Sequence, residues 1–216
     1  MKGGIGNILS WYCSYVIMSD GVLGIMNAVI GTASVPGMLL APLLAKKFGK
    51  RNCLIAFNVM RAVFAALMLF TADSPFLFLA SLYIATLATG GDAVITSAAT
   101  ADIFDYQQWK TGKRLEGFIT QFGGMLVTAA TMLSAFILPY FYRHYGLGTD
   151  YTVLYDSAVR TPIFNIIIIT TVVSCLLTVI PMFFYDMTEK KQQHIIEDLK
   201  ERADSENAAE EEAENI

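Results

Sequence analysis

Long apolar runs, separated by short polar stretches, make up most of this chain. An α-helix needs about 20 apolar residues to cross a bilayer, because each residue advances it by about 1.5 Å. Hydrophobic residues make up 55% of the chain and charged residues only 16%. Such runs are longer than the strands of an outer-membrane barrel, so the sequence predicts an all-α, polytopic membrane protein. The helix bundle is predicted in residues 1–186, with apolar runs at about 5–18, 22–45, 53–71, 76–101, 118–142 and 162–185.

The distribution of charge predicts the orientation of this bundle and the character of its tail. Lysine and arginine cluster in the loops 46–52 and 102–116 and in the tail 187–216, whereas the intervening loops hold only Arg143 and Arg160. Because basic loops stay on the cytoplasmic side of a membrane, both loops and the C-terminus are predicted to be cytoplasmic. The tail is acidic overall; we expect an amphipathic helix that gives way to disorder from Ser205.

A dense charged and aromatic motif lies between the fourth and fifth runs. Asp102 and Asp105 are three residues apart on a helix end, so both carboxylates project to one face. Basic residues follow within reach, and Glu116 opens the next helix, where its charge suits the N-terminal dipole. The motif is either a solvated loop or an ion-pair latch that holds neighbouring helices in one conformation. Its candidate latch residues are Asp102, Asp105, Tyr106, Trp109, Lys110, Arg114 and Glu116.

The spacing of this motif resembles a family signature. The pattern Ala101-Asp102-x-x-Asp105-Tyr106-x-x-Trp109-Lys110-Thr111-Gly112-x-Arg114-x-Glu116-Gly117 resembles that of the glycoside–pentoside–hexuronide:cation symporters, which include the melibiose permease and belong to the major facilitator superfamily. The loop from Lys46 to Arg51 resembles the short basic loop of the superfamily, although Lys46 stands where that loop often begins with Asp.

The resemblance implies that the chain is the C-terminal half of a twelve-helix transporter. The first run covers only about two thirds of a 30 Å hydrocarbon core, so it would be part of helix seven, followed by helices eight to twelve. The expected activity is symport of a sugar or glycoside with Na⁺ or H⁺ by alternating access, without another cofactor. The expected partners are the lipid bilayer, most simply a bacterial cytoplasmic membrane, the sugar and a missing N-terminal six-helix half, with no nucleic acid. The motif residues would form a cytoplasmic latch and would not bind the sugar.

Two charges lie inside the predicted membrane spans. Arg61 lies about 12 Å from the basic end of the third run, and Asp92 lies about 15–18 Å from the same end of the fourth. Consecutive helices joined by a short turn are antiparallel neighbours, so an Arg61–Asp92 ion pair is plausible. Such a pair would be a static structural element or would take part in cation or substrate coupling; absence of contact is the remaining alternative.

Other residues are candidates for the substrate path. Gln121 and Thr128 lie on a polar, small-residue face of the fifth run, which would line a hydrated path or pack closely against another helix. Some members of the resembled family carry a Lys where this chain has Thr128, so the coupling cation stays open. Trp11, Tyr12 and Tyr15 would stack on a sugar or form an interfacial aromatic belt.

The residue types argue against an enzyme or a metal protein. The cysteines and histidines lie far apart, which predicts no disulfide and no metal site. An intramembrane Mg²⁺-dependent transferase would use Asp102 and Asp105, but it needs a second acidic cluster that no other loop on this side supplies. A non-transporting subunit, or a half-protein that works with a partner half, is the remaining alternative.

Overall fold

The computed structural model describes residues 4–18, 20–72, 74–147, 151–185 and 187–214, and within these ranges it contains helices and no strand. The predicted all-α fold is thereby confirmed. The elements are α1 (Gly4–Tyr12), the π-helix η1 (Cys13–Ile17), α2 (Asp20–Phe48), α3 (Lys50–Met68), α4 (Pro75–Thr111), α5 (Glu116–His144), the 3₁₀ helix η2 (Tyr151–Tyr155), α6 (Ser157–Phe183) and α7 (Glu189–Glu214).

Four helices in the described part of the chain are long and apolar enough to cross a membrane. They are Leu23–Phe48, Lys50–Met68, Pro75–Thr111 and Ser157–Phe183. The shorter apolar segment Ile8–Ile17 corresponds to the run predicted to be too short, and α5 occupies the run predicted at 118–142.

The long helix α4 corrects the predicted position of the charged motif. The sequence places a loop from residue 102 to 116, but α4 continues through 37 residues to Thr111, and the break is confined to residues 112–115. Large apolar side chains interleave with the charged ones after Asp102, so the helix keeps a face that can pack. Gly112 then ends it with φ 69°, a left-handed conformation that glycine adopts without steric cost.

Two glycine contacts bring the central helices close together. A β-carbon on Gly37 of α2 would meet the carbonyl oxygen of Leu87, and one on Gly90 of α4 would meet that of Ser34. Gly91 faces the ring of Phe57 on α3, where a β-carbon would also clash. The backbones of α2 and α4 therefore touch directly, as small residues permit in membrane bundles.

The buried apolar residues form two clusters, one toward each end of the bundle. The first joins α1, the start of α4 and the first half of α6; in it Tyr12 stacks on Phe78 with ring centroids 4.0 Å apart. The second lies toward the other end, where Cys53, Leu54 and Phe57 of α3 pack with Ile95 of α4.

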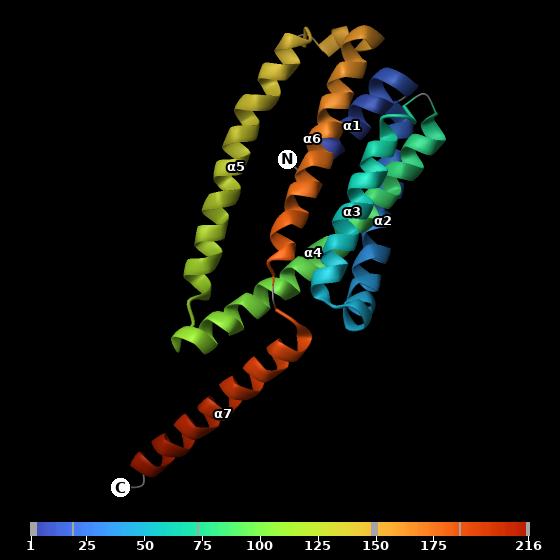
Figure 1. The fold of residues 1–216 in the computed structure, drawn as a ribbon. Helices are drawn as coiled ribbons and strands as arrows, with labels where there is room; N and C mark the ends of the chain where they lie inside the picture. Colours follow the sequence, from blue (N-terminus) through green and yellow to red (C-terminus); the bar gives the residue numbers. More distant parts are fainter. Residues whose placement is uncertain (1–3, 19, 73, 148–150, 186, 215–216) are drawn as a thin grey trace.

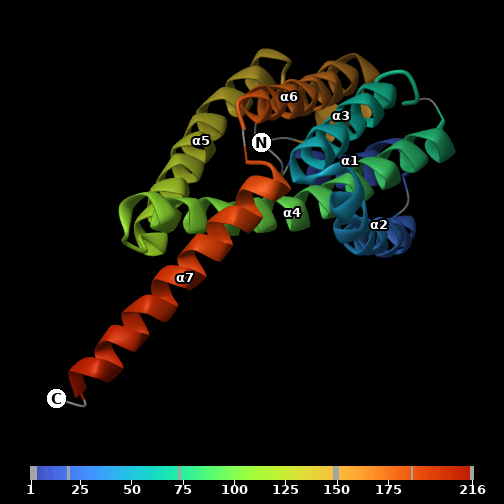
Figure 2. The ribbon, with the colours of Figure 1, turned by 60° about the horizontal axis from the view of Figure 1, so that its bottom comes forward.

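Two helices lie outside this packed group (Figure 1). α5 is joined at its ends to α4 and α6 but stands apart from both, and most of its described side chains are exposed. α7 leaves the end of the bundle that carries the α2–α3 turn and extends away from it (Figure 2). Disorder from Ser205 stays a prediction; the described backbone of α7 is helical to Glu214, a segment rich in the strong helix formers alanine and glutamate.

Candidate functional site

The charged end of the bundle carries a cluster formed by Lys50, Asp102 and Gln192, which we call the Asp102 cluster. Lys50 Nζ at the start of α3 lies 2.8 Å and 2.6 Å from the carboxylate oxygens of Asp102 on α4. The side chain of Gln192 on α7 accepts from Lys50 Nζ at 3.0 Å and donates to Asp102 Oδ1. The Asp102 side chain is only 4% exposed, so this is a largely buried ion pair that three helices share.

A second set of contacts attaches α7 to the end of α4. Trp109 Nε1 donates to Asp198 Oδ2 at 2.9 Å, and Arg202 Nη1 donates to the carbonyl of Trp109 at 3.1 Å. The ammonium of Lys191 lies 5.7 Å from the ring centroid of Tyr106, a cation–π distance. Three turns of the tail are thus fixed to the motif.

The other members of the motif contribute less. Arg114 and Glu116 pair at 2.6 Å, but the pair is exposed and bridges two residues of the same turn. Among the described residues, the structure records no hydrogen bond or ion pair from the side chain of Asp105 or Lys110. The sequence placed basic residues within reach of both aspartates without assigning pairs; in the structure the partner of Asp102 is Lys50, on a neighbouring helix.

Three polar residues are buried at mid-depth between the apolar helices. Asn58 and Arg61 on α3 and Asp92 on α4 are each at most 4% exposed. Asn58 Nδ2 donates to Asp92 Oδ1 at 2.7 Å. Within the described chain no ion pair joins Arg61 to Asp92, so the predicted pair is corrected: the amide of Asn58, one turn before Arg61, takes that place. Arg61 Nε and Nη1 are buried without a hydrogen-bond partner.

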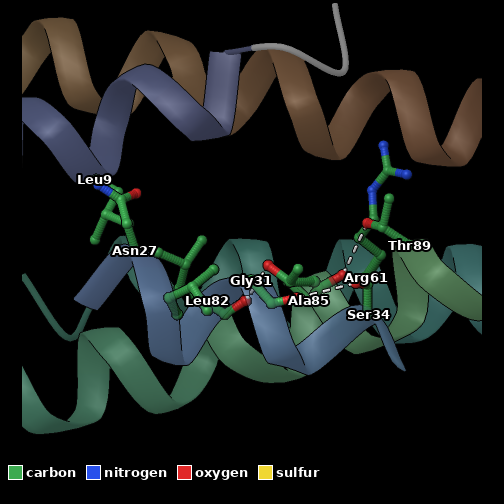
Figure 3. A pocket seen from close by; sticks show the side chains of 10 residues that line it. Leu9, Asn27, Gly31, Ser34, Arg61, Leu82, Ala85 and Thr89 are labelled. Carbon is green, nitrogen blue, oxygen red and sulfur yellow. Dashed lines mark hydrogen bonds between the residues drawn. The ribbon is translucent and has the colours of Figure 1, made fainter. Parts of the chain in front are cut away.

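Arg61 lines a pocket of about 330 Å³ between α1, α2, α3 and α4. Figure 3 shows Leu9 and Asn27 at one end of it and Arg61, Ser34 and Thr89 at the other. Its polar lining also includes Thr86, and its walls are Ile30, Gly31, Leu82 and Ala85. The volume lies in the range of small-molecule sites, about 300–1,000 Å³.

The residues predicted for a substrate path do not line this pocket. Tyr12 is buried against Phe78, and its hydroxyl donates to the carbonyl of Ala72 at 2.9 Å. Trp11 and Tyr15 lie in an aromatic group with tyrosines at the end of the bundle opposite the Asp102 cluster. Gln121 and Thr128 are exposed on α5. Their role in a path stays a prediction.

Sequence reasoning missed Lys50, Gln192 and Asn58. Lys50 was considered only as one of several positive charges in the loop 46–52. Asn58 had a detectable signal, since it is an amide in an apolar run three residues before Arg61 and on the same helix face. Gln192 had none. In the described part of the chain, no three His, Cys, Asp or Glu residues group in a way that could hold a metal ion.

Comparison with known proteins gives a family match over most of the chain. The family model described as "MFS/sugar transport protein" matches residues 2–189. No solved structure gives a significant match.

Several bacterial transporters are similar to the chain. A putative sulfoquinovose importer of Escherichia coli (strain K12) is 28% identical over 95% of the chain and 44% of its own length. An uncharacterized symporter of Bacillus subtilis (strain 168) is 27% identical over 91% of the chain and 42% of its own length. An isoprimeverose transporter of Lactiplantibacillus pentosus is 28% identical over 49% of the chain and 22% of its own length. The chain spans less than half the length of these relatives.

Proposed function

The chain belongs to the MFS/sugar transport protein family, and from that membership we propose that it forms one half of a secondary active transporter. In this proposal two helix bundles rock about a site between them, and a sugar or glycoside moves together with Na⁺ or H⁺. The family, and relatives named as an importer, a symporter and a transporter, indicate a transporter rather than an enzyme. The names sulfoquinovose importer and isoprimeverose transporter support a carbohydrate substrate.

The observation that carries the proposal is the Arg61 pocket. Arg61 lies about 16 Å along α3 from Lys50, close to the middle of a 30 Å hydrocarbon core. A charged side chain at that depth is costly, so such residues normally face a bundle interior or a substrate path. The pocket combines this cation with hydroxyl and amide side chains, which are the groups that bind sugar hydroxyls.

The Asp102 cluster has a complementary role in the proposal. We assign the end of the bundle that carries it to the cytoplasm, because the basic residues concentrate there. The cluster joins α3, α4 and α7 and would hold that end in one conformation of the transport cycle. This role does not require the cluster to touch the sugar.

Reconstitution tests the proposal directly. The protein, isolated in the form in which a cell makes it, is placed in proteoliposomes, and uptake of a panel of labelled glycosides is measured under imposed Na⁺ or H⁺ gradients. We expect one of the gradients to accelerate uptake of at least one glycoside, and collapsing it with an ionophore to abolish that acceleration.

The same preparation tests the remaining parts of the proposal. The mass of the purified particle shows whether a second helix bundle accompanies this one, in the same polypeptide or as a separate subunit. Uptake that neither gradient changes would contradict symport. Absence of uptake for every glycoside would favour a non-transporting membrane subunit.

A further inference from the structure

We propose that a phospholipid binds in a pocket between η1, the end of α3 and α6, with its phosphate on Arg160 and part of an acyl chain against the apolar walls. This pocket, which we call the Arg160 pocket, has a volume of about 270 Å³. It lies at the end of the bundle opposite α7, where α6 begins (Figure 1). It shares no lining residue with the Arg61 pocket, so the proposal goes beyond sugar transport and does not depend on it.

The guanidinium of Arg160 is held in place with one edge open. Nη1 donates to the carbonyl of Tyr15 in η1 at 2.9 Å and to that of Leu154 in η2 at 3.3 Å. Within the described chain Nε and Nη2 have no recorded acceptor, and neither atom is enclosed by the protein. Nε–H and Nη2–H point in the same direction, and such a fork binds two oxygens of a phosphate. Arg160 is therefore positioned to receive an oxyanion.

The rest of the lining is amphipathic. Asn165 and Thr161 lie beside Arg160 on α6, and the described residues give neither side chain a recorded hydrogen bond, so both can contact a headgroup or its ester oxygens. Apolar side chains form the opposite walls and are partly exposed: Val16 of η1, and Leu69 and Ala72 at the end of α3. A molecule with a polar head and an apolar chain matches both parts.

Depth favours a lipid over a free anion. Arg160 is the fourth residue of α6 and precedes by two residues the apolar run that begins at Pro162. Trp11 and Tyr15 lie in the aromatic group at the same end, and such side chains concentrate at the level of the lipid headgroups. Phosphate is the anionic group that phospholipids place at this level, and basic pockets between membrane helices bind lipid headgroups. A free phosphate would occupy the guanidinium but would leave the apolar walls without a partner.

The test separates the headgroup from the chain. Binding to the purified protein, in the form in which a cell makes it, is measured in detergent by native mass spectrometry. The ligands are dioleoyl phosphatidylglycerol, dioleoylglycerol, which lacks the phosphate, and glycerol phosphate, which lacks the chains. We expect the first phosphatidylglycerol to bind about tenfold or more tightly than either of the others, because a charge-assisted bidentate pair contributes roughly that factor.

Substitutions then locate the site. Arg160→Gln should weaken binding of phosphatidylglycerol about tenfold and leave that of dioleoylglycerol within about threefold. Arg143→Gln removes an exposed arginine near the same end, on α5, and is the matched control; it should change neither affinity. Because Arg160 also supports η1, Asn165→Leu is a second variant that leaves the recorded bonds of Arg160 in place. It should weaken binding of phosphatidylglycerol about threefold or more.

Four outcomes would overturn the proposal. Equal binding of dioleoylglycerol by the unmodified protein would make the site an apolar groove, and equal binding of glycerol phosphate would make it a simple anion site; neither measurement needs a variant. Equal losses in Arg160→Gln and Arg143→Gln would show attraction by surface charge alone. If Arg160→Gln does not fold, Asn165→Leu decides, and unchanged affinity in that variant contradicts the proposal. The proposed transport function stands in each of these cases.

Discussion

Neutralising Asp102 should destabilise the protein far more than neutralising Asp105, three residues further along the same helix. Asp102→Asn keeps the shape of the side chain but removes its charge, so an amide group faces the ammonium of Lys50. The lost interaction is a pair at 2.6 Å in which the carboxylate is 4% exposed and Lys50 22% exposed. Asp105 is the matched control, since the described residues give its side chain no ion pair or hydrogen bond.

The magnitude follows from burial. Breaking a fully buried ion pair costs about 3–5 kcal/mol, whereas an exposed pair contributes about 0–1 kcal/mol. Because Lys50 keeps some contact with water, we expect the loss to be lower, about 2–3 kcal/mol. For a chain of this size, 1 kcal/mol corresponds to about 2–4 °C in Tm, so Asp102→Asn should lower Tm by roughly 5–10 °C. Asp105→Asn should stay within about 0.5 kcal/mol.

Thermal unfolding in detergent, followed with a thiol-reactive dye, measures this difference. Cys13, Cys53 and Cys175 are all buried thiols, so their reaction with the dye reports the loss of the bundle core. A double variant with Lys50→Gln completes a mutant cycle, and a coupling energy of at least 1 kcal/mol is expected between the two positions. Additive effects, or equal shifts for the two aspartates, would refute the assignment of the buried pair.

Three further perturbations test other parts of the structure. Gly90→Val forces a side chain against the backbone of α2 and should cost at least about 1–3 kcal/mol in the same assay, whereas Gly31→Ala meets open space and should be nearly neutral. Trp109→Phe removes the donor to Asp198 at 2.9 Å, so hydrogen exchange in α7 should become faster while exchange in α3 stays unchanged. Tyr12→Phe deletes a buried hydrogen bond at 2.9 Å and should lower the unfolding free energy by about 1 kcal/mol; no change would contradict that contact.

The helices of this fold could be predicted from the apolar runs, but their ends could not. Apolar length predicted four of the spans because a bilayer imposes a minimum length on each helix. The end of α4 was missed because charge was taken to mark the end of the helix, while its backbone hydrogen bonds continue past the apolar run until Gly112. The helical backbone of α7 beyond Ser205 was not predicted for a related reason: charge density indicates solvent exposure, and exposure does not exclude a helix rich in alanine and glutamate.

The sequence identified several residues of the candidate site, but it did not predict which residues pair with each other. The motif predicted a role for Asp102 and Trp109, and both make tertiary contacts. Their partners lie 52 and 89 residues away, and no local spacing encodes those distances. At mid-depth, opposite charge and similar depth favoured Arg61 as the partner of Asp92, because a neutral donor such as an amide carries no charge that would mark it in the sequence. Asn58, a shorter side chain one turn away, occupies Asp92 Oδ1.

Two polar pairs fix α3 and α4 relative to each other. Lys50–Asp102 and Asn58–Asp92 join the same two antiparallel helices, at positions about 12–15 Å apart along each axis, and Phe57 packs on Gly91 beside the second pair. Two polar contacts and one close packing contact oppose sliding of α3 along α4, because any axial shift would break a buried hydrogen bond or leave a charge unpaired. Arg61, one turn beyond Asn58, therefore keeps its height relative to α4 while both pairs are formed. In the proposed transport cycle, α3 can slide along α4 only when these pairs break.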